Sequence, residues 1–194
     1  MPVDPAKPTN IMKSIASTIQ RSATLFALST FLYAGAFAQD APKLTDPEIA
    51  HVGVTANQID VNYGKLALEK SKNKDIRHFA ETMIKDHEGV IKQATELAAK
   101  LGVTPADNAM SKSLKQGEVA EMKKLRALNG VAFEKAYIDN EVAYHKAVIN
   151  AVKTVLIPQT QNADLKNLFI SISPVLDSHL EHAEMVAKEF AAKK

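Results

Sequence analysis

The chain has 194 residues, with 24 basic and 22 acidic side chains and no cysteine. The absence of cysteine excludes disulfides, thiolate metal ligands, thiol catalysis and a lipid-modified N-terminal cysteine. Three basic residues and one acidic residue fall in the first 38 positions, so the remaining 156 residues are formally neutral. Their charge gives no reason to expect binding to nucleic acid or to an acidic membrane surface.

The N-terminal segment has the layout of a secretory signal peptide. Lys13 and Arg21 precede an apolar stretch at residues 23–37, and Ala36-Phe37-Ala38 before Gln39 forms an A-x-A cleavage site. The stretch is shorter than the ~20 apolar residues that span a bilayer, which disfavours the alternative of a membrane anchor. We therefore expect a signal peptide at 1–38, a short linker at 39–44 and a domain at 45–190. Met12 begins a more usual signal-peptide layout than Met1, so either methionine could be the true start.

The rest of the chain reads as helical, because apolar residues recur at steps of three and four. The pattern predicts long helices at residues 45–72, 75–101, 131–156 and 164–190, with a weaker amphipathic helix at 111–128. Pro158 is expected to end the third long helix, and Pro174 to kink the fourth or break its first segment.

The segment at 111–128 indicates how the long helices connect. A helix of 18 residues spans about 27 Å, enough to carry the chain back along the bundle. The helices on either side of it could then run parallel, as in the ferritin-like topology of two hairpins joined by a long crossover. We expect this all-α, ferritin-like four-helix bundle; a simple up-down bundle with a helical excursion is the alternative.

The six histidines fall on two kinds of helix face. His51 and His78 lie among polar residues and are predicted to be solvated. Glu48-x-x-His51 matches the spacing of di-iron ligands, but it lies in the first turn on the polar side, and we interpret it as coincidence.

His87, His145 and His179 instead interrupt the apolar stripes of three long helices, each near the middle of its helix. Helices that pack with their ends aligned would place the three imidazoles in one layer of the core. A single inward histidine is usually a hydrogen-bonded core residue, and Tyr63, Tyr137 or Tyr144 could satisfy one here.

Three buried imidazoles are harder to satisfy separately, whereas a shared metal ion pairs one nitrogen of each. Glu141 lies one turn before His145, Asp86 adjoins His87, and His182 follows His179 by three residues. Neutral imidazoles with a carboxylate suit zinc, copper(II), iron or manganese. The sequence therefore predicts a metal site, with a structural polar layer as the alternative.

Three stretches carry a resemblance that extends over about residues 46–189. They are 79–87 (FAETMIKDH), the segment from Phe133 through Tyr137 to His145, and 174–180 (PVLDSHL). Together they resemble a widespread bacterial family of exported ferritin-like proteins, domain-of-unknown-function family 4142, often labelled outer-membrane proteins. The resemblance implies a ferritin-like bundle in the periplasm or envelope with no established activity, and it singles out His87, His145 and His179. The inward Glu-x-x-His pairs of a di-iron centre are absent, which argues against iron-storage chemistry.

Two functions are weighed from these observations. The first is an exported metal-binding bundle, with His87, His145 and His179 as ligands, Glu141 as the fourth, and His182 or Asp86 as outer partners; a haem bundle is a minor variant of it. The second is a non-catalytic envelope protein that binds a protein partner or self-associates, with the histidines as a polar core layer. A hydrolase is disfavoured because the chain has no nucleophile-elbow serine and no glycine-rich phosphate loop.

Overall fold

The computed structural model describes residues 43–192, which form a helical bundle. Four long helices make up the bundle: α1 (Asp46–Lys70), α2 (Lys74–Leu101), α4 (Gly130–Ala151) and α6 (Ala163–Ala192). The remaining elements are α3 (Ala109–Ala127), the π-helical segment η1 (Val152–Leu156) and the short α5 (Ile157–Gln159). No strand occurs between residues 43 and 192, which confirms the predicted all-α class; the predicted signal peptide lies outside the described residues.

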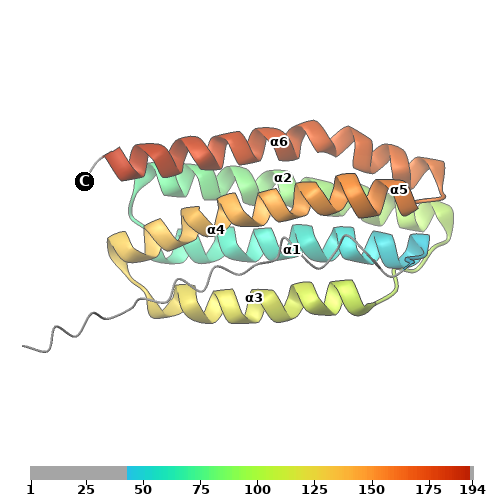
Figure 1. The fold of residues 1–194 in the computed structure, drawn as a ribbon, viewed down its shortest axis with the longest axis horizontal. Helices are drawn as coiled ribbons and strands as arrows, with labels where there is room; N and C mark the ends of the chain where they lie inside the picture. The colour runs from blue at the N-terminus through green and yellow to red at the C-terminus, as the bar shows by residue number, and fades with distance from the viewer. Residues whose placement is uncertain (1–42, 193–194) are drawn as a thin grey trace, which may run out of the picture. The chain divides into compact units, whose positions relative to one another are not determined.

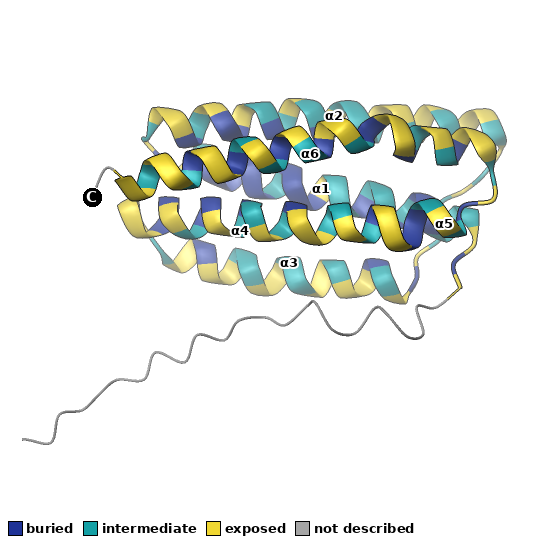
Figure 2. Cartoon of the chain, turned by 45° about the horizontal axis from the view of Figure 1, so that its top comes forward, coloured by how far each residue is buried: buried dark blue, intermediate teal, exposed yellow. Residues whose placement is uncertain are grey.

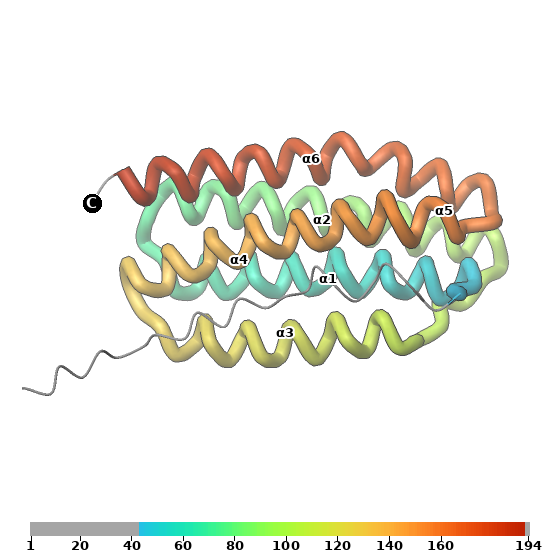
Figure 3. The backbone as a smooth tube through the Cα atoms, in the orientation of Figure 1, coloured from blue at the N-terminus to red at the C-terminus, as the bar shows by residue number. Residues whose placement is uncertain are grey.

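The connection between α2 and α4 has the form that the sequence predicted. The chain runs along α1, returns along α2, is carried back by α3 and then follows α4 in the direction of α2 (Figure 1). The tube in Figure 3 shows the same path, with α6 returning beside α2 and α4. The four long helices thus form two antiparallel pairs, α1 with α2 and α4 with α6, joined by one long helical crossover.

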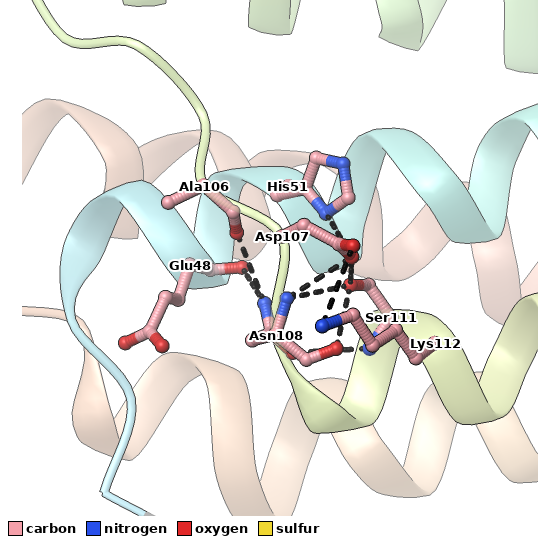
Figure 4. A network of polar contacts seen from close by, with 7 residues as sticks. All are labelled: Glu48, His51, Ala106, Asp107, Asn108, Ser111 and Lys112. Carbon is pink, nitrogen blue, oxygen red and sulfur yellow. Dashed lines mark hydrogen bonds and ion pairs between the residues drawn. The ribbon is translucent and has the colours of Figure 1, made fainter.

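Side-chain caps fix where α1 and α3 begin. Thr45 caps α1, and its backbone N–H donates to Glu48 Oε2 at 2.8 Å, so Glu48 serves a capping box rather than a metal. Asn108 caps α3 by accepting from the Ser111 N–H at 3.0 Å, and its amide nitrogen donates to the Glu48 carbonyl at 3.1 Å (Figure 4). One asparagine therefore starts the crossover helix and ties it to the first turn of α1.

Pro158 does not end its helix, and Pro174 does not break its helix. The helix does not end before Pro158 but continues to Gln159, preceded by η1, in which the Ile157 N–H donates to the Val152 carbonyl five residues back. The wider turn lets the chain accommodate a residue that has no N–H to offer. The helix α6 is continuous through Pro174, so its first segment is not broken, because a single proline removes only one hydrogen bond of a 30-residue helix.

The buried side chains form two apolar clusters separated by a polar layer. One cluster includes Phe79, Phe133 and Tyr137, and the other includes Phe169 and Leu176. Buried positions follow the inner faces of the long helices, whereas α3 covers the outside and is mostly exposed (Figure 2). Between residues 43 and 192, none of the helices has both the length and the apolar character needed to cross a membrane.

Candidate metal centre

Each of the four long helices places at least one polar side chain in the layer between the apolar clusters, and four of these side chains face one another. These side chains are Asp60 from α1, His87 from α2, His145 from α4 and His179 from α6, and none is more than 5% exposed. The three imidazole rings have centroids 5.1 to 5.7 Å apart. The structure thus brings together the three histidines that the sequence singled out, and it adds an aspartate.

Hydrogen bonds determine which nitrogen of His87 carries its proton. Nδ1 lies 2.7 Å from Asn57 Oδ1, and the Asn57 amide nitrogen donates to the Gly53 carbonyl at 2.8 Å. Because that bond turns the Asn57 oxygen toward the ring, Nδ1 must donate. The lone pair of His87 is therefore on Nε2, which has no hydrogen-bond partner among the described residues.

The same logic applies to the other two rings. His145 Nδ1 lies 3.0 Å from the backbone carbonyl of Glu141, and His179 Nε2 lies 3.0 Å from Asp86 Oδ2. Both partners accept, so the free lone pairs are on His145 Nε2 and His179 Nδ1, and both atoms are buried without a partner within residues 43–192. A histidine that donates from one nitrogen and leaves the other bare has the form of a metal ligand with its outer support.

Asp60 faces two of these bare nitrogens. Its Oδ2 lies 3.5 Å from His87 Nε2 and 3.6 Å from His145 Nε2, too far for good hydrogen bonds. Ligand atoms about 2.1 Å from a tetrahedral metal ion are about 3.4 Å from one another. The observed separations therefore match those of two atoms that share a metal ion, and ligand atoms of all three histidines lie within 4.8 Å of one another.

Glu141 is a second carboxyl group in this layer. It is 0% exposed, and its Oε2 lies 3.6 Å from His145 Nδ1, the nitrogen that faces away from Asp60. It can be grouped with Asp60 and His145 as a set of potential ligands. Burial and then the charge of Asp60 raise the pKa of the Glu141 carboxyl, and the nearby Tyr137 hydroxyl offsets only part of that rise; neither side chain forms a well-aligned hydrogen bond.

Burial favours the neutral forms of the two carboxyl groups and of two of the imidazoles, those of His87 and His145. It raises the pKa of Asp60 to about 8, and burial followed by the charge of Asp60 raises the pKa of Glu141 well above its usual value. Burial also lowers the pKa of His145 to about 4, and burial and the two neighbouring imidazoles lower the pKa of His87 well below its usual value. At neutral pH the metal-free site therefore presents bare imidazole nitrogens beside protonated carboxyl groups.

The other predicted residues lie at different distances from the centre. Asp86 supports His179 by the hydrogen bond described above, not His87, its neighbour in sequence. His182 packs against Phe79 and His78, with ring centroids 5.0 and 6.4 Å away, outside the three-histidine group. His78 is exposed as predicted, but His51 is half-buried, with its Nδ1 3.7 Å from Asp107 Oδ1 of the loop that leads into α3 (Figure 4).

Two residues of the site were not predicted from the sequence, and the helical pattern could have identified one of them. Asp60 follows Ala56 by four residues and precedes Tyr63 by three, so it lies on the inner face of α1. It is also near the middle of its helix, as the three histidines are. Asn57 gave no such signal, because its contact with His87 depends on how α1 and α2 are rotated against each other.

A comparison with protein families gives one match. A family model described as a domain of unknown function (DUF4142) matches residues 33–186. The chain belongs to this family. The DUF4142 match includes Asp60, His87, His145 and His179. No curated protein and no solved structure matches the chain.

Proposed function

We propose that this protein binds a divalent transition-metal ion between its four long helices. The ligands are His87 Nε2, His145 Nε2, His179 Nδ1 and the carboxylate of Asp60. One observation carries the proposal: three buried nitrogens with free lone pairs converge, and the Asp60 carboxyl faces two of them at co-ligand distance.

The cost of leaving the layer empty supports a metal over a purely structural polar layer. The three imidazole nitrogens and the four carboxyl oxygens of Asp60 and Glu141 are buried without hydrogen-bond partners among the described residues. Each buried polar atom without a hydrogen-bond partner destabilises the fold by about 1 to 3 kcal/mol. In a purely structural layer we would expect these groups to form hydrogen bonds with one another. Here the outward-facing nitrogens are paired and the inward-facing ones are not.

The donor set restricts the choice of ion. Three neutral imidazoles and one carboxylate suit zinc, iron, manganese or copper(II), while calcium and magnesium prefer shells of oxygen. The inward Glu-x-x-His pairs of a di-iron bundle are replaced by one aspartate and three single histidines. The proposal is therefore a single-ion centre, suited to metal sequestration, sensing or modest redox chemistry.

Glu141 can balance the charge of the metal site without being a ligand. A divalent ion with three neutral imidazoles and one carboxylate leaves a buried net charge of +1, which is costly in a low-dielectric core. Ionised Glu141, beside His145 and coupled to Asp60, would make the layer neutral. We therefore assign Glu141 as the charge-balancing group of the centre.

Calorimetric metal titration of tag-free protein tests the proposal. Alanine at His145 or His179 should weaken binding of zinc or iron(II) at least 100-fold, while His78→Ala and His51→Ala, the matched controls, should leave it unchanged. Metal content below about a tenth of an equivalent, with no thermal shift on adding zinc, copper, iron or manganese, would refute the proposal.

The location of this metal centre is the second part of the proposal. We infer that the protein is exported and works in the periplasm or envelope, because the segment at 1–38 combines a basic start, a short apolar stretch and an A-x-A ending. The mass of the protein recovered from the periplasm should then correspond to a chain that starts at Gln39. A mature chain that keeps residues 23–37 and stays in the cytoplasm would contradict export.

A further inference from the structure

A cavity adjoins the proposed metal centre on one side. Its volume, counted as the space in which the centre of a water molecule fits, is about 30 Å³. Asp60, His87 and His145 are part of its lining. The rest of the lining is mainly apolar and includes Val152, Leu156, Phe169, Ile172 and Leu176. The cavity thus connects the bare imidazole nitrogens of the site with the apolar cluster that includes Phe169 and Leu176.

Two local features form part of the lining. Val152 and Leu156 are the first and last residues of η1, and π-helical turns are frequent at functional sites. Gly53 also lines the cavity, and an added Cβ there would come within 3.1 Å of Phe169 Cζ. Any other residue at position 53 would therefore press on the wall of the cavity.

The size and lining of the cavity indicate its occupant. A cavity in which the centre of a water molecule can move through about 30 Å³ has more room than one water molecule needs, so it admits a molecule of two or three heavy atoms. Water needs two to four polar partners, and apolar cavities stay dry and take up apolar guests. Gly53 and Ala56 of α1 and Val148 of α4 are partly exposed, so the lining of the cavity extends to the surface at these residues.

We propose that the cavity admits a small apolar molecule of the size of dioxygen to the metal centre, on the side formed by Asp60, His87 and His145. The part that concerns the metal rests on the proposed function, whereas binding of a small apolar guest in the cavity does not need the ion. Gly53 controls access to the cavity in this proposal. It acts by leaving space and touches neither the metal nor its ligands.

Xenon binding to the metal-free protein, followed by xenon NMR and by diffraction from pressurised crystals, tests the cavity alone. Xenon should bind beside Phe169 and Ile172, and Gly53→Ala should weaken it at least fivefold. Gly89→Ala is the matched control, because an added Cβ there meets nothing within 4 Å, and it should leave xenon binding unchanged. Ordered water in the cavity with no xenon would overturn the proposal.

Nitric oxide added without oxygen to the iron(II)-loaded protein tests access to the metal. The electron paramagnetic resonance signal of the nitrosyl complex should form at least fivefold more slowly in Gly53→Ala than in Gly89→Ala. Equal rates would overturn the access route even if xenon binds. If the protein binds xenon but takes up neither zinc, copper, iron nor manganese, the metal proposal fails and the cavity stands.

Discussion

Replacing Asp60 by asparagine should separate stability from metal binding. The substitution keeps the shape of the side chain but removes the group that ionises. In the unfolded chain Asp60 titrates near 3.8, and in the metal-free fold burial raises its pKa to about 8. The fold therefore keeps the carboxyl protonated at pH 7, which lowers the free energy of unfolding. The asparagine variant has no ionisable group at this position, so this penalty is absent.

The magnitude follows from the difference between the two pKa values. Between pH 3.8 and pH 7 the penalty accumulates at about 1.4 kcal/mol per pH unit, so Asp60→Asn should stabilise the metal-free protein by about 2 to 4 kcal/mol at pH 7. For a domain of this size that raises the melting temperature by about 5 to 15 °C. Loss of the anionic ligand should at the same time weaken metal binding at least 100-fold.

Thermal unfolding followed by circular dichroism, with chelator and with saturating zinc, gives both quantities. Asp139→Asn is the matched control: Asp139 is exposed and pairs with Lys135, so its removal should change neither the metal-free stability by more than about 0.5 kcal/mol nor the shift on adding zinc. If Asp60→Asn destabilised the metal-free protein and left the zinc shift intact, Asp60 would be a structural residue and the reasoning would be refuted.

Three further predictions follow from the same site. The metal-free protein should lose about 2 kcal/mol of stability from Asp60 between pH 6.5 and 8, because the penalty of keeping its carboxyl protonated in the fold keeps growing until the pH reaches its raised pKa of about 8. The opposite effect of His145, whose pKa is lowered to about 4, is complete above pH 6.5. Urea unfolding with chelator checks this, and constant stability over that range would contradict it. Metal binding at pH 7 should release about two protons, one from Asp60 and one from Glu141, and Glu141→Gln should release one fewer. Calorimetry in buffers of different ionisation enthalpy measures the number of protons released. Equal release from both proteins would exclude Glu141 as the balancing charge. His182→Ala should change metal affinity less than threefold, since its ring packs on Phe79 outside the layer, and a loss comparable to that of His145→Ala would place it in the site.

The parts of the fold that the sequence predicted are those governed by local periodicity. The apolar stripes placed all five longer helices, and the length of residues 111–128 predicted that α2 and α4 run parallel. The prolines were harder, because the effect of Pro158 depends on whether the preceding backbone can widen into a π-helical turn. The spacing of apolar residues does not show whether the backbone before Pro158 will form such a turn.

The candidate site was predictable to the same extent. The three histidines were found because each replaces an apolar residue on a buried stripe. Asp60 lay on the inner face of α1 but was missed, since an aspartate among lysines and glutamates is not conspicuous by type. Which hydrogen bond fixes each imidazole depends on the rotation of neighbouring helices, so Asn57 as the partner of His87 and Asp86 as the partner of His179 required the structure.

The most direct test of the metal centre is an anomalous difference map from crystals of the tag-free protein, measured at the absorption edge of the metal it contains. We expect one strong peak within about 2.0 to 2.2 Å of His87 Nε2, His145 Nε2, His179 Nδ1 and an Asp60 oxygen. A fully loaded crystal with its peak beside His51 and Asp107 or between His78 and His182, and none among the four helices, would contradict it.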